Sequence, residues 1–222
     1  MANLEIKCVI FDSDGTLVDS EHLGHYCMEL KLKKLGVHIP AQKMKKDYRG
    51  WKLNALLEDI EHKNPGLTYS ESFIPEYRAD LEQMFEESLE AIPMIDDALS
   101  KISVPICVAS SGPMFKIKTA MRVTGLAKYF GENLFSAYDL GVWKPEPDLF
   151  LHAAEKMGFL PENCAVVEDS KVGVQAANAA GMRVVHYNPE SISLAEVKPT
   201  VEIRSMGDLP RSLYEIGLSQ QK

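Results

Sequence analysis

Short, wholly apolar runs alternate with helical patterns through most of the chain. The apolar runs cover residues 8–11, 105–110, 164–168 and 183–187, with the sequences CVIF, PICVAS, CAVVE and RVVHY. Helical periodicity fills the intervals between the later runs, over residues 113–124, 147–157 and 170–180. Buried strands that alternate with helices are typical of a parallel sheet covered on both faces. The pattern predicts an α/β fold with a Rossmann-like parallel sheet, and one more short strand and a helix after about residue 200.

A different pattern occupies residues 20–90, where no strand signal is found. Leu23, Cys27 and Leu30 recur at helical spacing, and a similar period returns between residues 77 and 89. Glycine and proline residues divide this stretch into about four helices. We therefore expect a helical domain over residues 19–90, inserted into a core built from residues 1–18 and 91–222.

Composition narrows the class of protein. The chain has 222 residues, is 45% hydrophobic and 25% charged, and carries a net charge of −8. An acidic chain lacks the basic surface of a nucleic-acid binder. No apolar run has the length of a membrane span, and the N-terminus lacks the features of a signal peptide. The four cysteines form no CxxC pair, so we expect free thiols. These features predict a cytoplasmic protein, expected to be a monomer, with no nucleic-acid or membrane partner.

Polar side chains follow three of the predicted strands at their carboxyl ends. The segments are Asp12-Ser13-Asp14-Gly15-Thr16, Ser110-Ser111-Gly112 and Glu168-Asp169-Ser170. A fourth segment, GVWKPEPDLF, carries Lys144 and precedes the strand at 164–168. Ligands of parallel sheets bind at the carboxyl ends of the strands. The carboxylates, the hydroxyl groups and the lysine should therefore converge on one small volume.

This set of groups suits phosphoryl transfer. Clustered carboxylates repel one another unless a cation lies among them, and oxygen ligands without histidine favour Mg²⁺. A hydroxyl and an ammonium group can orient the phosphate oxygens, and Gly15 lets the backbone approach the phosphate closely. Of two acids at the end of one strand, one can attack phosphorus while the other protonates the leaving oxygen. The expected partner is a small phosphorylated metabolite.

Four motifs resemble those of the haloacid dehalogenase (HAD) superfamily of phosphatases. DSDGTLVDS resembles the first motif, DxDGT, and VASSG resembles the second, a strand that ends in Ser or Thr. WKPEPDLF resembles the third, with Lys before Pro-x-Pro, and VVEDSKVGVQAANAAGM resembles the fourth, an acidic pair before a helix rich in Gly and Ala. All four occur in order between residues 8 and 182. The resemblance implies the HAD fold and phosphatase activity.

The resemblance also implies catalytic roles for individual residues. Asp12 would be the nucleophile that becomes an aspartyl-phosphate, and Asp14 would be the general acid and base. Ser110 would bind the phosphoryl group, with Ser111 and Gly112 beside it. Lys144 would hold both the nucleophile and the phosphate.

A metal site follows from the same resemblance. Mg²⁺ would be held by the Asp12 carboxylate, the main-chain carbonyl of Asp14, Asp169 and Glu168, and Mn²⁺ or Co²⁺ could substitute. Each acid also has a structural explanation, since Asp12 and Asp14 could form a capping turn and the acidic pair could cap the next helix. The four motifs in order favour the catalytic interpretation.

The inserted helices resemble the C1 cap of subfamily I, which includes sugar-phosphate phosphatases. Arg49 and Lys52 flank Gly50-Trp51 within a cluster of basic residues, although the neighbouring lysines also fit a solvated helix face. A substrate with a second anionic group would suit these two cations. Longer runs, such as ENCAVVEDS, are similar to bacterial members that act on 6-phosphogluconate. We therefore expect a phosphorylated sugar or sugar acid, with 6-phosphogluconate fitting best, as the substrate.

Three other functions remain to be weighed. The first is a phosphosugar mutase like β-phosphoglucomutase, but Gly24 and Leu53 stand where those mutases carry His and Arg. The second is a phospho-accepting signalling module, which would place the acidic pair first and lack the inserted helices. The third is an inactive phosphatase kept for binding, and the complete set of acids opposes it. A hydrolase is the best-supported prediction.

Overall fold

The computed structural model describes residues 5–48, 51 and 53–218. The chain divides into two compact units, one formed by Met1–Val18 with Glu90–Lys222 and the other by Asp19–Leu89. We call the first the sheet unit and the second the helical unit, and each is described by itself. No described helix combines the length and the apolar character that crossing a bilayer requires.

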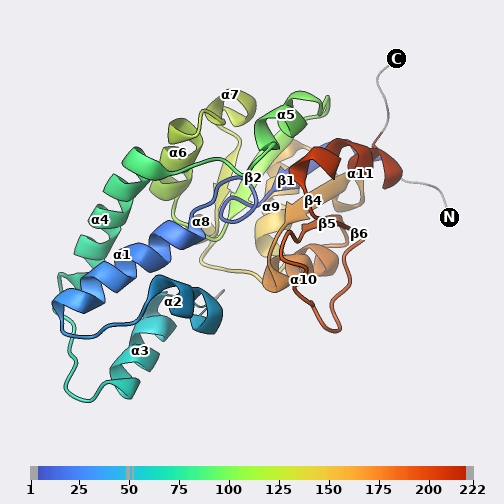
Figure 1. The fold of residues 1–222 in the computed structure, drawn as a ribbon. Coiled ribbons are helices and arrows are strands. Elements are labelled where there is room, and N and C mark those ends of the chain that lie inside the picture. The colour runs from blue at the N-terminus through green and yellow to red at the C-terminus, as the bar shows by residue number, and fades with distance from the viewer. Residues whose placement is uncertain (1–4, 49–50, 52, 219–222) are drawn as a thin grey trace. The chain divides into compact units, whose positions relative to one another are not determined.

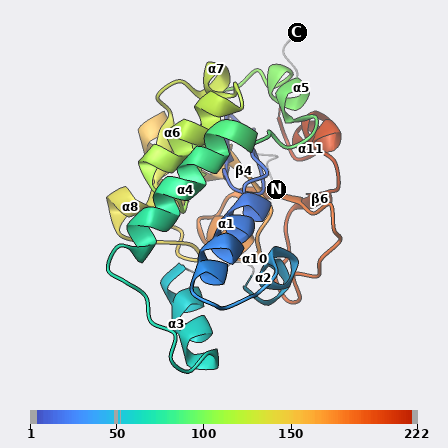
Figure 2. The same cartoon turned by 60° about the vertical axis from the view of Figure 1, so that its left-hand side comes forward.

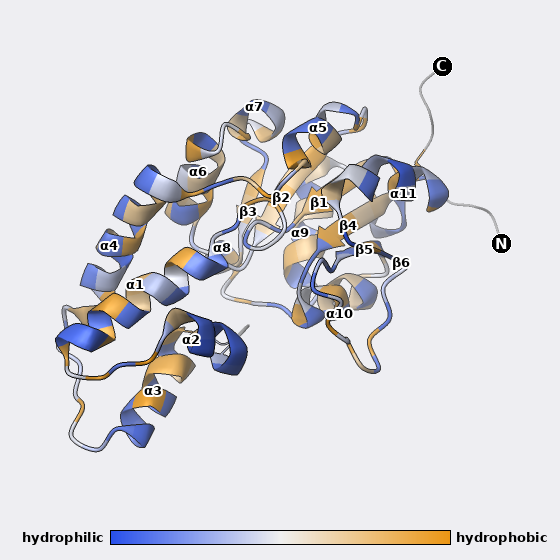
Figure 3. Ribbon diagram, viewed as in Figure 1, coloured by the Kyte–Doolittle hydropathy of each residue, from blue (hydrophilic) through white to orange (hydrophobic). Residues whose placement is uncertain are grey.

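The sheet unit is built on one parallel sheet of six strands in the order β3-β2-β1-β4-β5-β6 (Figure 1). The strands are β1 Cys8–Phe11, β2 Ile106–Ser110, β3 Leu134–Ser136, β4 Cys164–Glu168, β5 Arg183–Tyr187 and β6 Val201–Ile203. Every residue of β1, β2 and β4 is buried, because helices cover both faces, and Figure 3 shows these strands as hydrophobic. The strand order reverses on either side of β1, so the carboxyl end of β1 is a topological switch point. The predicted α/β parallel fold is confirmed.

Helices of the sheet unit pack on its two faces according to the alternation of side chains along β1. Cys8 and Ile10 pack with Leu149 of α9 and Val174 of α10, whereas the Phe11 ring contacts Phe130 of α7 on the other side, 5.9 Å between centroids. The helices are α5 Ile95–Ser100, α6 Met114–Val123, α7 Ala127–Phe130, α8 Ala137–Leu140, α9 Asp148–Met157, α10 Lys171–Ala179 and α11 Leu209–Glu215. Short 3-10 turns lie at Pro161–Asn163 and Met206–Asp208.

The segments that leave and re-enter the sheet unit pair with each other. Val18 and Ala91 form an antiparallel bridge, and the Ile92 amide donates to the Leu17 carbonyl at 2.9 Å. The chain therefore departs for the helical unit and returns from it at one place.

The helical unit contains α1 Glu21–Lys34, α2 Ala41–Tyr48, α3 Leu53–Lys63 and α4 Phe73–Ser88. It has its own apolar cluster, in which Leu32, Met44 and Ile60 are fully buried. Within the unit, α1 and α4 run side by side (Figure 2). Lys31 of α1 is buried against α4 and forms ion pairs with Glu76 and Asp80 there, at 3.2 and 2.9 Å. The two helices are thus joined by a buried charge as well as by apolar packing.

Candidate active site

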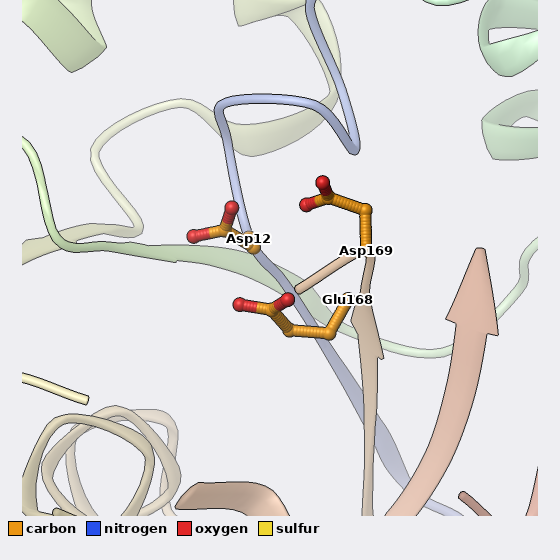
Figure 4. A group of neighbouring side chains, drawn as sticks. All are labelled: Asp12, Glu168 and Asp169. Atoms are coloured by element: carbon orange, nitrogen blue, oxygen red, sulfur yellow. The ribbon is translucent and has the colours of Figure 1, made fainter. Parts of the chain in front are cut away.

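Three carboxylates meet where β1 and β4 end. Asp12 follows β1, Glu168 is the last residue of β4, and Asp169 comes next. Because Phe11 lies opposite Val167 in the parallel pair, the two strands end at the same level. Each of the three acids offers an oxygen within 4.8 Å of the others (Figure 4). The cluster contains only oxygen donors and lies at the switch point of the sheet.

Lys144 joins two of these acids. Its Nζ donates to Asp12 Oδ1 at 2.6 Å and to Glu168 Oε1 at 2.7 Å. The Lys144 side chain is 3% exposed, and its ammonium also lies over the Phe150 ring, 4.8 Å from the centroid. A buried cation of this kind is stable only because two carboxylates face it.

The protonation states of Asp12 and Lys144 depend on each other. Burial raises the pKa of the Asp12 carboxyl to about 7, the Lys144 ammonium opposes the shift, and the Glu168 carboxylate adds to it. Burial by itself lowers the pKa of Lys144, but its attraction to Asp12 and Glu168 outweighs this and raises that pKa above its ordinary value. Lys144 is therefore a fixed positive charge, and it keeps Asp12 within reach of ionisation near neutral pH.

Glu168 is held on both of its oxygens. Oε1 accepts from Lys144, and Oε2 accepts from the Ser170 amide at 2.6 Å. A Cβ at position 173 would lie 1.8 Å from Glu168 Oε1, so only glycine leaves room for this side chain at the start of α10. Sequence reasoning assigned Glu168 to a metal and did not anticipate its contact with Lys144 or the role of Gly173.

Asp169 packs directly on the loop that follows β1. Its Oδ1 accepts from Thr16 Oγ1 at 3.2 Å. Gly15 has a φ of +81°, and a Cβ there would come within 2.5 Å of Asp169 Oδ2. In the structure the group against Gly15 is the Asp169 carboxylate, and the approach of the Gly15 backbone to phosphate stays a prediction.

Asp14 lies against a residue that the sequence analysis missed. Lys116, in the first turn of α6, has its Nζ 2.8 Å from both Asp14 carboxylate oxygens. Both side chains are partly exposed, at 26% for Lys116 and 29% for Asp14. The only sequence signal was a lysine four residues after the Ser-Ser-Gly motif, which is too common to single out.

The end of β2 forms a tight turn beside this pair. Ser110 is buried, and its Oγ accepts from the Gly112 amide at 3.1 Å. The Gly112 carbonyl in turn accepts from Ser136 Oγ at 2.7 Å. Ser111 is exposed at the tip of the turn. The hydroxyl of Ser110 and the backbone of Gly112 thus lie in a fixed arrangement on the sheet unit.

Two predicted substrate-binding residues, Arg49 and Lys52, lie outside the described residues. Among their neighbours in α2, Lys43 pairs with Asp47 at 2.7 Å on an exposed helix face. For Lys43, this favours the solvated-face interpretation.

Comparison with known proteins identifies the family. Residues 6–181 match the model of the haloacid dehalogenase-like hydrolases. The 6-phosphogluconate phosphatase of Escherichia coli is 36% identical, over 88% of this chain and 89% of that protein. The phosphorylated carbohydrates phosphatase of Thermotoga maritima is 28% identical, over 86% of this chain and 91% of that protein.

A solved structure agrees with these relatives. A haloacid dehalogenase-like protein of Agrobacterium tumefaciens superimposes with a TM-score of 0.83 at 30% identity, over 95% of this chain and 99% of that one. With an acidic cluster at the switch point of a parallel sheet and a family match over most of its length, the chain belongs to the haloacid dehalogenase-like hydrolases and is an enzyme of the phosphatase kind.

Proposed function

We propose that this enzyme is a Mg²⁺-dependent phosphomonoesterase that acts on a small phosphorylated sugar or sugar acid through an aspartyl-phosphate. The observation that carries the proposal is the buried Asp12, held by Lys144 and grouped with Asp169 and Glu168. A carboxylate in this setting has a fixed cation to stabilise it and, two residues on, an acid that can handle the proton. The helical unit would serve as the cap.

The donor set fits a hard divalent ion. Asp12 and Asp169, with the main-chain carbonyl of Asp14, would hold Mg²⁺, and Mn²⁺ or Co²⁺ would be accepted by the same oxygens. Glu168 would complete the charge of the site while its oxygens fix Lys144 and the start of α10. The bound ion would supply charge neutralisation on the phosphoryl oxygens.

The proposed reaction has two steps. One Asp12 oxygen attacks phosphorus, the bond from phosphorus to the ester oxygen breaks, and Asp14 gives that oxygen a proton. Asp14 then takes a proton from water, the water oxygen attacks the aspartyl-phosphate, and inorganic phosphate leaves with Asp12 restored. Ser110 and Lys144 would hold the phosphoryl oxygens. For proton transfer, Asp14 must give up its present ion pair with Lys116.

The substrate class is supported by the relatives. The bacterial protein that is 36% identical is named for 6-phosphogluconate, and other relatives are named for phosphorylated carbohydrates, fructose 1-phosphate and hexitols. We propose 6-phosphogluconate as the best substrate, with Ser111 and Gly112 beside its phosphate and with Arg49 and Lys52 near its carboxylate.

The first test is phosphate release from a panel of phosphorylated sugars and sugar acids, with Mg²⁺ and with EDTA. Mg²⁺-dependent release that is highest for 6-phosphogluconate is the expected result. Release led by a neutral hexose phosphate would keep the mechanism and reject the sugar acid. If β-glucose 1-phosphate and glucose 6-phosphate interconverted without net release, the mutase hypothesis would replace the phosphatase.

The nucleophile is tested with Asp12→Asn. The amide cannot attack phosphorus, so turnover should fall by at least about a thousandfold while the far-ultraviolet circular dichroism spectrum stays that of the wild type. Because the substitution also alters the Lys144 contact, Thr119→Ser on α6 serves as a control for a mild change elsewhere in the sheet unit. Near-normal turnover of Asp12→Asn would refute the assignment.

The cap cation is tested with Arg49→Ala. The value of kcat/KM should fall at least tenfold more for 6-phosphogluconate than for glucose 6-phosphate, because only the first carries a carboxylate. Lys43→Ala, at a lysine that already pairs with Asp47, should change neither value. Equal losses on both substrates would show that Arg49 does not read the carboxylate.

A further inference from the structure

We propose that His186 is a positioning residue that fixes Asp169 as a metal ligand. The inference rests on the proposed function for the presence of the metal. It starts from one contact, in which His186 Nε2 lies 3.1 Å from the main-chain oxygen of Asp169. A carbonyl oxygen only accepts hydrogen bonds, so Nε2 carries the proton and donates. No sequence motif marked this histidine.

Strand register explains why His186 reaches this peptide. In the parallel pair of β4 and β5, His186 lies opposite Glu168, the residue before Asp169. The imidazole is 1% exposed and therefore has no water to bond in place of the protein. A buried polar group of this kind is costly unless it is paired, so the contact with Asp169 is part of the folded state.

The other side of the imidazole faces a carboxylate oxygen, which also only accepts, so this second contact is a hydrogen bond when Nδ1 carries a proton as well as Nε2. Nδ1 lies 3.4 Å from Glu202 Oε2 on β6, and the same oxygen accepts from Asn188 Nδ2 at 3.1 Å. Asn188 is itself fixed, because its Oδ1 accepts from the Ile192 amide at 2.8 Å and its Nδ2 donates to the Ile192 carbonyl at 2.9 Å. The ring plane of His186 is thus set by a chain of contacts that runs to the turn after β5.

Asp169 is consequently restrained at two points. Thr16 and Gly15 set the position of its carboxylate, and His186 sets the orientation of the peptide that carries it. Outer partners that orient a metal ligand typically contribute 10–100-fold to metal affinity. With the hydrogen bond from His186 removed, the peptide after Asp169 can rotate and the carboxylate has to be ordered by the ion itself.

A direct measurement of metal binding distinguishes an effect of His186 on the metal site from an effect on the stability of the protein. Mn²⁺, whose free form is measured by electron paramagnetic resonance, is titrated into the full-length protein without substrate. His186→Leu removes the donor and should weaken binding about tenfold. His186→Gln places an amide nitrogen near the position of Nε2 and should recover most of the affinity. Glu202→Ala, at a partly exposed side chain, should weaken binding by a smaller factor without unfolding the protein.

Two further variants make the result decisive. Thr200→Val removes the hydroxyl that accepts from the Val184 amide of β5, so it should lower the melting temperature while Mn²⁺ affinity stays that of the wild type. Asp169→Asn should bind Mn²⁺ far more weakly than any of the others. If Asp169→Asn binds normally, the metal site itself is misassigned and the role of His186 falls with it. If Asp169→Asn loses binding while His186→Leu and Glu202→Ala keep it, the metal site stands and His186 has no part in it.

Discussion

His25 of α1 is partly buried and has an unsatisfied ring nitrogen. Its Nδ1 is buried and has no hydrogen-bond partner in the part of the chain that the structure describes. Burial lowers the pKa of the imidazole below its ordinary value, which the nearby Glu21 opposes and Lys45 reinforces. The folded protein therefore favours neutral His25 more strongly than the unfolded chain does.

A pH dependence of stability follows from His25. A depressed histidine pKa means that the unfolded state binds more protons, so stability is lost as pH falls through the ordinary pKa of about 6.5. Between pH 8 and pH 5, the melting temperature of the wild type should therefore fall by more than that of His25→Leu, which cannot take up the proton. Scanning calorimetry of both proteins checks this, and parallel curves would contradict it.

The individual residues of the candidate active site differ in whether their contacts could be predicted from the sequence. Asp12, Asp169 and Lys144 were expected to meet because the ends of neighbouring parallel strands coincide, and that argument needs only the order of strands and loops. The contacts made by Lys116 and His186 depend on side-chain packing between segments far apart in the chain, which no local pattern records. Arg49 and Lys52 remain predictions from sequence alone.

The strands of the sheet were predictable in proportion to their length and burial. The runs at 8–11, 105–110, 164–168 and 183–187 correspond to β1, β2, β4 and β5, because a fully buried strand is apolar at every position. The three residues of β3, Leu134–Ser136, are too few to show a period and were missed. The expected strand and helix near the end of the chain are β6 and α11.

A substitution of Gly173 in the first turn of α10 tests whether Glu168 occupies the space beside this helix. Gly173→Ala would ordinarily stabilise a helix by about 1 kcal/mol, but here the new methyl group collides with Glu168. We expect a net loss of about 1–3 kcal/mol of unfolding free energy, together with reduced turnover as Glu168 and Lys144 are displaced. Urea unfolding and a steady-state assay measure the two effects.

A matched substitution in α1 provides the control. At Gly24 the nearest atom to an added Cβ is Tyr77 Oη at 3.5 Å, an ordinary contact. Gly24→Ala should therefore raise stability by up to about 1 kcal/mol. Stabilisation by both substitutions would mean that Glu168 does not occupy the space beside position 173.

The two units of the molecule carry one tryptophan each, Trp51 in the helical unit and Trp143 in the sheet unit. Trp143→Phe leaves Trp51, which contacts the Tyr48 ring, as the reporter of the helical unit, and Trp51→Phe leaves Trp143. In each background, Ile60→Ala opens a cavity in the helical core at a cost of about 2–5 kcal/mol. Relative to its parent, the variant with Ile60→Ala should show a larger shift of the urea unfolding midpoint when unfolding is followed by Trp51 fluorescence than when it is followed by Trp143 fluorescence.

The same variants address how the units depend on each other. The carboxylates, Lys144 and His186 all belong to the sheet unit, so Ile60→Ala should leave Mn²⁺ affinity as in the wild type. Turnover should decline, because the substitution weakens the helical unit, which we propose to be the cap. Equal shifts in both fluorescence signals would instead show that the two units unfold as one cooperative body.

The paired crossing at Val18 and Ala91 has a consequence for redesign. The two ends of the inserted unit lie one strand spacing apart, about 5 Å, and a turn of a few residues spans such a gap. The helical unit is therefore an insertion whose two connections to the sheet unit lie at fixed, paired positions. The hydrogen bond between Ile92 and Leu17 belongs to the sheet unit and does not depend on the sequence inserted between them. With the helical unit in its proposed role as the cap, exchanging it at these points for the corresponding unit of a relative named for another sugar phosphate should change the preferred substrate while the carboxylates and Lys144 stay in place.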